Sequence, residues 1–275
     1  MTSQWVLGYY VGYQIDRCSI ESIPWSCLTH IAFGPLKVKT STDATGKSVV
    51  TLVTDFDDSH GEGVSDALKV SDAAHAHGVK ALLMFGGAGE SKSIGEAASD
   101  PHRKTLIGEL LTLMEKLGYD GIDLDWEDDK DLKGNIVAPV VKSDLVALAK
   151  GLRDAKSDII LTFPAPAVNP NDSPHNTEQL EFKKVTPYVD KFSVMTYTGT
   201  YTLGSDWASW FVSPLTGDDK AHFPVSIDQN LKLWTEDSMT KDGTTVKGVP
   251  KDKLLMGIGA FAICYPPYIT EALNR

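Results

Sequence analysis

Three acidic side chains alternate with apolar ones in the stretch Asp120-Gly121-Ile122-Asp123-Leu124-Asp125-Trp126-Glu127. Successive side chains of a β-strand point to opposite faces, so Asp123, Asp125 and Glu127 are expected to line one face. Like charges held that close together cannot all ionise, and at least one carboxyl group should keep its proton near neutral pH. A protonated carboxyl group is what a general acid needs. We expect Glu127, the last of the row, to be that acid.

Two other interpretations of the acidic row are a solvated edge and a site for a divalent metal ion. A solvated edge would not alternate with isoleucine, leucine and tryptophan. The alternation therefore favours a buried row, in which Asp125 shares a proton with Glu127 and orients a substrate group. We expect neither a metal ion nor a cofactor.

Strand-like and helix-like segments alternate along the chain. Apolar runs typical of buried strands cover 5–13, 28–38, 79–85, 121–127, 159–163, 191–197 and 254–263, and a short hairpin is expected near 49–53. Helical spacing covers 64–77, 106–117, 145–152 and 227–239. This order predicts an α/β fold with a parallel sheet covered by helices. Because no Gly-x-Gly-x-x-Gly follows the first strand, a TIM-type (β/α)8 barrel is preferred to a doubly wound sheet.

Composition excludes several classes of protein. The chain has 275 residues, 42% of them hydrophobic and 23% charged, which is ordinary globular composition. Its formal net charge of -11 disfavours binding to nucleic acid or to anionic membranes. No composition shift divides it, so we expect one domain over residues 1–275. Three cysteines allow at most one disulfide, between Cys18 and Cys27, or three free thiols.

The acidic row fits the pattern Asp-x-x-Asp-x-Asp-x-Glu, on the fourth strand, and so resembles glycoside hydrolase family 18, the chitinase family. Further segments that resemble the family are Gly8-Tyr9-Tyr10, Ile31-Ala32-Phe33, Gly86-Gly87, Met195-Thr196-Tyr197 and 253–259. The resemblance implies cleavage of β-1,4-linked N-acetylglucosamine with retention of configuration. The nucleophile would be the 2-acetamido group of the substrate, an exception to the scheme with two enzyme carboxylates.

The resemblance also implies a role for each residue of the motif. Glu127 would protonate the glycosidic oxygen, and Asp125 would orient the acetamido group. Asp123 would share a proton with Asp125, and Tyr197 would hydrogen-bond the acetamido oxygen. Asp120 is expected to be structural, as are Gly86 and Gly87, which form a tight exit from the third strand.

Two positions depart from the family pattern. Where the third-strand motif of the family reads Ser-x-Gly-Gly, this chain has Met84-Phe85-Gly86-Gly87, so a hydroxyl group beside the inner aspartate is missing. After Tyr197 the family usually has Asp or Asn, and here Thr198 follows. Neither departure affects the acid.

Aromatic and sulfur-containing side chains near the strand ends are candidates for lining a sugar site. Aromatic faces stack on pyranose rings, and the candidates are Tyr10, Phe33, Met195 and Trp207. Packing in the core or at the rim explains each of them equally well.

The last twelve residues bear on how the barrel closes. They contain two consecutive prolines and no tryptophan, so we expect no eighth strand and an incomplete barrel. Its open edges would be covered by the C-terminal segment, by a second copy of the chain, or by marginal closure of the two edge strands. The protein is expected to be either a monomer or such a dimer. No signal peptide is visible, and the family resemblance predicts a secreted protein.

The expected function is that of an endo-acting chitinase whose partner is chitin or chito-oligosaccharides, with no nucleic acid and no membrane. Two alternatives remain open. A barrel lectin would bind chitin without cleaving it, and an endo-β-N-acetylglucosaminidase would act on N-glycan cores by the same mechanism.

Overall fold

The computed structural model describes residues 4–46, 48–57, 61–131, 135–168, 179–197, 213–217, 226–240 and 242–259. By their contacts the residues fall into two compact units. The first comprises Met1–Pro164 with Pro187–Asp190, and the second comprises Ala165–Thr186 with Lys191–Arg275. No helix in the described ranges has the length and apolar character needed to cross a membrane.

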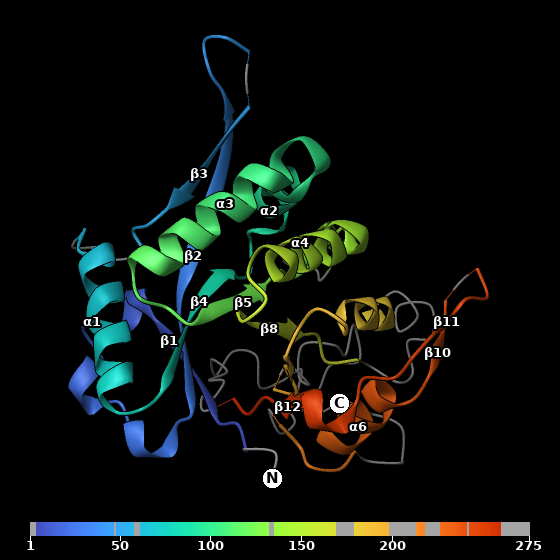
Figure 1. Ribbon diagram of the computed structural model, residues 1–275. Coiled ribbons are helices and arrows are strands. Elements are labelled where there is room, and N and C mark those ends of the chain that lie inside the picture. Colours follow the sequence, from blue (N-terminus) through green and yellow to red (C-terminus); the bar gives the residue numbers. More distant parts are fainter. Residues whose placement is uncertain are drawn as a thin grey trace, which may run out of the picture. The chain divides into compact units, whose positions relative to one another are not determined.

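The first unit is built on a parallel sheet. Its strands run in the spatial order β1 (Leu7–Val11), β2 (His30–Thr42), β4 (Lys80–Gly86), β5 (Gly121–Asp125) and β8 (Ile160–Ala165). Strand β3 (Ser48–Val53) pairs antiparallel with the far half of β2, and the two form the long hairpin of Figure 1. A short antiparallel pair follows β5, made of β6 (Asp129–Lys130) and β7 (Ile136–Ala138).

Helices separate these strands along the chain. They are α1 (Gly63–Ala76), α2 (Ser91–Ala98), α3 (Asp100–Lys116) and α4 (Lys142–Ala155), with short 3-10 turns at Gly12–Gln14, Ile20–Ser22 and Trp25–Cys27. Each long helix buries an apolar stripe at helical spacing, which in α3 consists of Leu106, Leu110 and Met114. The strand-helix alternation predicted from the sequence is therefore present, and it is an α/β arrangement.

Register divides the side chains of the sheet between two faces. Met84 lies beside Asp123, and Asp123 lies beside Thr162, so these three share a face. One residue along, the other face carries a row of buried apolar side chains, namely Tyr10, Phe33, Leu83, Ile122 and Leu161. Asp123 and Thr162 are thus buried polar neighbours on one face, whereas the row on the other face is apolar.

The second unit contains two parallel strands, β9 (Lys191–Val194) and β12 (Leu254–Met256). It also contains helix α6 (Ile227–Thr235), the antiparallel pair β10 (Ser238–Met239) and β11 (Thr245–Val246), and 3-10 turns at Glu181–Val185 and Lys251–Lys253. Asn230 of α6 ties this unit together, since its side-chain oxygen accepts a hydrogen bond from the Val168 amide at 2.7 Å. The C-terminal residues 260–275, on which the expectation of a missing eighth strand depends, lie outside the described residues.

Candidate active site

The acidic row lies where β5 ends. Asp123 and Asp125 are the third and last residues of β5, and Glu127 follows two residues later. Asp123 is fully buried, Asp125 is 8% exposed and Glu127 is half-buried. Exposure therefore rises along the row toward its end, as expected if Glu127 is the member that meets a substrate.

Asp123 is held by hydroxyl groups from two other strands. Its Oδ1 atom accepts a hydrogen bond from Thr162 Oγ1 on β8, and Tyr9 on β1 donates to the same oxygen over 3.4 Å. Met84, its neighbour on β4, offers no hydroxyl group. The hydroxyl group that the departure at Met84 removes is thus supplied from the opposite side of Asp123, by Thr162.

Two carboxylate oxygens in the row are buried without a hydrogen-bond partner among the described residues. They are Asp123 Oδ2 and Asp125 Oδ1. Leaving a buried acceptor unsatisfied costs about 1–3 kcal/mol, so proteins seldom retain one without a use for it. A proton on one of these carboxyl groups, or a donor from a bound ligand, would satisfy them.

Burial sets the protonation of the row. It raises the pKa of Asp123 to about 7, although the hydrogen bonds from Thr162 and Tyr9 oppose the rise. Burial, and then the charges of Glu127 and Asp123, raise the pKa of Asp125 well above its usual value. Burial also raises the pKa of Glu127, while the nearby Lys130 ammonium acts against it. The site can therefore hold protons near neutral pH, as a general acid requires.

Gly86 and Gly87 let the chain leave β4 close beside Asp125. Gly86 has a φ of 109°, and a Cβ atom there would lie 2.3 Å from the Asp125 carbonyl oxygen. Gly87 has a φ of 115°, and its amide donates to that oxygen at 2.7 Å. A side chain at position 86 would push the strand carrying the acids out of place.

Asp120 lies just before β5, at the opposite end from Glu127, and its carboxylate accepts several hydrogen bonds. Its carboxylate accepts hydrogen bonds from Lys80 Nζ at 2.6 Å, His75 Nε2 at 2.8 Å and the Ala81 amide at 2.9 Å. Burial raises its pKa, but these three bonds outweigh burial and lower the pKa below its usual value. These contacts support the structural role expected for Asp120.

The aromatic candidates are distributed differently from the expectation. Tyr10 and Phe33 lie on the face of the sheet opposite Asp123, where both are buried. The Tyr10 hydroxyl group donates to the Cys18 carbonyl oxygen at 2.6 Å, and the Phe33 ring packs on Phe56. The strand alternation therefore places both side chains away from the acidic row. Tyr9, one residue earlier and 43% exposed, takes their place.

Tyr197 and Met195 belong to the second unit. Both follow the end of β9, and both are half-buried. The Met195 amide donates to the Ala165 carbonyl oxygen at 2.8 Å, while the Tyr197 ring lies against Gly257, where a Cβ atom would come within 2.9 Å of it. Trp207 and Thr198 lie outside the described residues.

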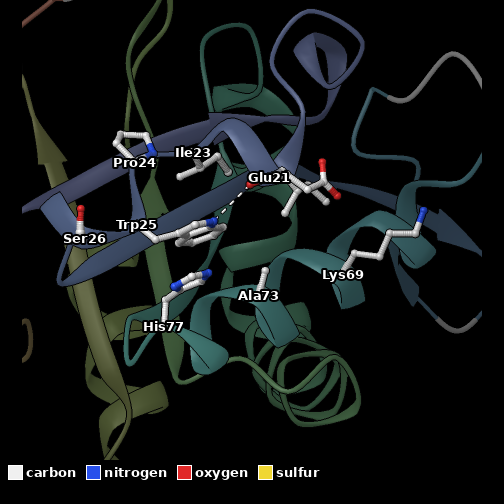
Figure 2. Close-up of a pocket in the computed structure, with 9 residues that line it drawn as sticks. Glu21, Ile23, Pro24, Trp25, Ser26, Lys69, Ala73 and His77 are labelled. Carbon is white, nitrogen blue, oxygen red and sulfur yellow. Dashed lines mark hydrogen bonds between the residues drawn. The ribbon is translucent and has the colours of Figure 1, made fainter.

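A cavity of about 560 Å³ lies away from the acidic row. It is lined by Ile20, Glu21, Ile23, Pro24, Trp25, Ser26, Lys69, Ala73 and His77 (Figure 2). Trp25 precedes β2 and His77 precedes β4, so the cavity belongs to the amino end of the parallel sheet, whereas the acids lie at the carboxyl end. Its aromatic groups are already engaged, because the Trp25 indole N–H donates to the Ile20 carbonyl oxygen and the His77 ring stacks on the indole at 5.6 Å.

The described residues contain no group of three histidine, cysteine, aspartate or glutamate side chains that could hold a metal ion. Cys18 and Cys27 are both free and exposed, so the disulfide considered between them is not formed in this structure.

A comparison with known protein families assigns the chain to a family. Residues 5–265 match the model for glycosyl hydrolases family 18, and the chain belongs to that family. A probable chitinase 2 from Drosophila melanogaster is 26% identical over 93% of this chain and 49% of its own length. A chitinase-like effector from Moniliophthora perniciosa is 25% identical over 96% of this chain and 57% of its own. The chain thus spans about half the length of these two curated relatives.

Solved structures show the same fold. A group IV chitinase from Ostrinia furnacalis, crystallised with allosamidin, superimposes with a TM-score of 0.67 over 93% of this chain and 66% of that one, at 20% sequence identity. At 20% sequence identity, this structural similarity supports the fold but not the function. Together with the family match, it confirms the TIM-barrel type of α/β fold predicted from the sequence.

Proposed function

We propose that this protein is a chitinase that cleaves β-1,4-linked N-acetylglucosamine polymers internally and with retention of configuration. The observation that carries the proposal is the buried row on β5, in which Asp123 Oδ2 and Asp125 Oδ1 have no partner among the described residues. An acetamido N–H group of a bound sugar would satisfy Asp125 Oδ1. The names of the curated relatives support the same substrate class.

The proposed reaction begins with proton transfer. Glu127 gives its proton to the glycosidic oxygen while the acetamido carbonyl oxygen of the same sugar attacks the anomeric carbon. The bond from that carbon to the leaving oxygen breaks, its electron pair stays on the oxygen, and an oxazolinium ion forms. Water then attacks the anomeric carbon and loses a proton to the Glu127 carboxylate. The bond from that carbon to the acetamido oxygen breaks, its electron pair returns to the acetamido group, and the site is back in its starting state.

The remaining residues of the site act on the acetamido group. Asp125 accepts its N–H group and stabilises the positive charge that develops on the ring nitrogen. Asp123 exchanges a proton with Asp125, helped by the hydrogen bonds from Thr162 and Tyr9. Tyr197 would donate to the acetamido oxygen, and Met195 and Trp207 would border the sugar.

The test compares three substrates with the wild type and Glu127→Gln: chito-oligosaccharides, the same oligosaccharides after deacetylation, and a glycoprotein with N-glycans. The proposal predicts that the wild type cleaves only the first and that the variant binds but barely cleaves it. Cleavage of the glycoprotein instead would assign the site to N-glycan cores. Binding of chito-oligosaccharide by the wild type without any cleavage would make the protein a lectin. Secretion and the oligomeric state stay predictions.

A further inference from the structure

Hydrogen bonds hold the chain in place on both sides of Glu127, the proposed acid. Before it, the Trp126 indole N–H donates to Ser91 Oγ at 2.9 Å. After it, the Asp129 carboxylate accepts from the Gly89 amide at 2.8 Å and from the Ser91 amide at 3.1 Å. Ser91 therefore holds the chain on both sides of Glu127, through its side chain on one side and its backbone on the other.

These contacts are protected from water at their centre. Ser91 is 2% exposed and Trp126 is 1% exposed. Hydrogen bonds in such surroundings exchange poorly with solvent and fix geometry more firmly than exposed ones. The Trp126–Ser91 bond is therefore part of the packed interior of the first unit, whereas the two bonds to Asp129 lie closer to its surface.

Asp129 also caps the N-terminus of helix α2. Helix α2 begins at Ser91, and Glu90, the residue before it, makes no side-chain cap. The first amide groups of a helix have no partner within the helix, and a carboxylate there satisfies them and interacts well with the helix dipole. Asp129, the first residue of β6, supplies that carboxylate to the Ser91 amide.

The loop after β4 thus meets the chain around Glu127 at successive points. Gly87 N–H binds the carbonyl oxygen of Asp125, and the bonds to Trp126 and Asp129 follow along the same loop. The neighbouring Asp128 makes a separate contact, since its carboxylate accepts from the Val140 amide at 2.7 Å. Of the two aspartates after the acid, only Asp129 is tied to the loop that also holds Trp126.

We propose that Asp129 is a positioning residue for Glu127, which fixes the acid by binding the Gly89 and Ser91 amides. The inference rests on the proposed function for its consequence in catalysis. General acid catalysis needs the acid within hydrogen-bond reach of the leaving oxygen, and a misplacement of 1 Å can cost about a hundredfold in rate. Without the bonds from Asp129 to the Gly89 and Ser91 amides, the Glu127 carboxyl group would remain but would be poorly positioned for proton transfer.

Charge gives Asp129 a second, separable effect. Burial is the main cause of the raised pKa of Glu127, Lys130 opposes it, and Asp129 and Asp128 each add to it. The other charged groups that interact with Glu127 are Asp123 and Asp125 on β5. Removing either Asp128 or Asp129 should therefore lower the pH at which activity falls on the alkaline side.

The experiment uses Asp129→Ala, Asp129→Asn and the control Asp128→Asn, each assayed on chito-oligosaccharide across pH. Asn at 128 keeps an acceptor for Val140 and loses the charge, so it reports the effect of charge alone. We expect all three variants to lose activity at lower pH than the wild type. Only Asp129→Ala should also lose about tenfold or more in kcat at its own optimum with KM little changed. Asp129→Asn, with one acceptor left, should fall between.

Two results would overturn the proposal. One is a kcat for Asp129→Ala within about threefold of the wild type, and the other is an equal loss in Asp128→Asn. Crystal structures of the wild type and Asp129→Ala provide a readout that does not need turnover. We expect the Glu127 carboxyl group to move by more than about 0.5 Å, and an unmoved carboxyl group would reject the proposal. If the wild type proves inactive while Glu127 moves in the variant, the proposed function fails and the positioning role stands.

Discussion

Replacing Asp123 by asparagine removes an ionisable group from the most buried place in the acidic row. In the folded protein, burial raises the pKa of Asp123 from 3.8 to about 7. The folded state therefore holds a proton that the unfolded chain has already lost above pH 4, and stability falls as pH rises toward 7. Each pH unit well below the folded-state pKa is worth about 1.4 kcal/mol, and less near it, so the span from pH 5 to pH 7 costs the wild type about 2 kcal/mol.

Asparagine cannot ionise, and its side-chain oxygen can still accept from Thr162 and Tyr9. The free energy of unfolding of Asp123→Asn, relative to the wild type, should thus rise by about 2 kcal/mol between pH 5 and pH 7. Urea unfolding at both pH values measures this difference. Asp120→Asn is the control, because hydrogen bonds lower the pKa of Asp120, and its loss should destabilise the protein at both pH values. A difference between Asp123→Asn and the wild type that does not change with pH would refute the argument.

Three further predictions concern other contacts. Thr162→Val removes the hydroxyl group that binds Asp123 and should lower kcat by about tenfold. Thr162→Ser keeps a hydroxyl group and should retain most of the wild-type kcat. Equal kcat values for the two variants would contradict this role of the hydroxyl group. Gly86→Ala places a Cβ atom against the Asp125 carbonyl oxygen and should destabilise the protein more than Gly87→Ala, whose Cβ meets nothing closer than 3.8 Å; thermal unfolding of the two variants decides. Lys183→Met deprives the Leu233 and Glu236 carbonyl oxygens of a buried donor and should cost at least about 2 kcal/mol in urea unfolding, and a smaller cost would show that water replaces the ammonium group.

The acidic row was predictable because strand alternation is a local property. The pattern in 120–127 by itself places Asp123 and Asp125 on one face, and the structure has them there. The same rule, applied to Gly8-Tyr9-Tyr10, distinguishes Tyr9 from Tyr10 only when the register with β2 and β4 is known. That register depends on pairing between strands that are far apart in the sequence, so the sequence alone did not select Tyr9.

Contacts between distant segments were missed for the same reason. Nothing in the local pattern connects Asp129 with Ser91, because the first begins β6 and the second begins α2, far apart in the sequence. Helix α2 was not predicted either, since it spans only eight residues and its cap comes from elsewhere in the chain. Thr162 could have been identified from the sequence, because it is a hydroxyl residue inside an otherwise apolar strand. In the structure it lies beside Asp123.

Several strands and helices end earlier than their apolar runs predict. Strand β9 ends at Val194 rather than at Tyr197, and helix α6 ends at Thr235, where the chain turns into the β10–β11 pair. The expected hairpin near 49–53 is confirmed as β3, which extends β2 to Thr42. Apolar runs therefore located the elements, while their ends were set by pairing partners.

The central claim is that Glu127 protonates the leaving oxygen, and leaving-group dependence tests it most directly. The measurement is kcat/KM of the wild type and Glu127→Gln on a chito-oligosaccharide and on a dinitrophenyl chito-oligosaccharide, whose leaving group needs no proton. We expect the variant to lose about 10²–10⁴-fold on the natural sugar and far less on the aryl glycoside. Equal losses on the two substrates, or wild-type turnover of the natural sugar by the variant, would contradict the account.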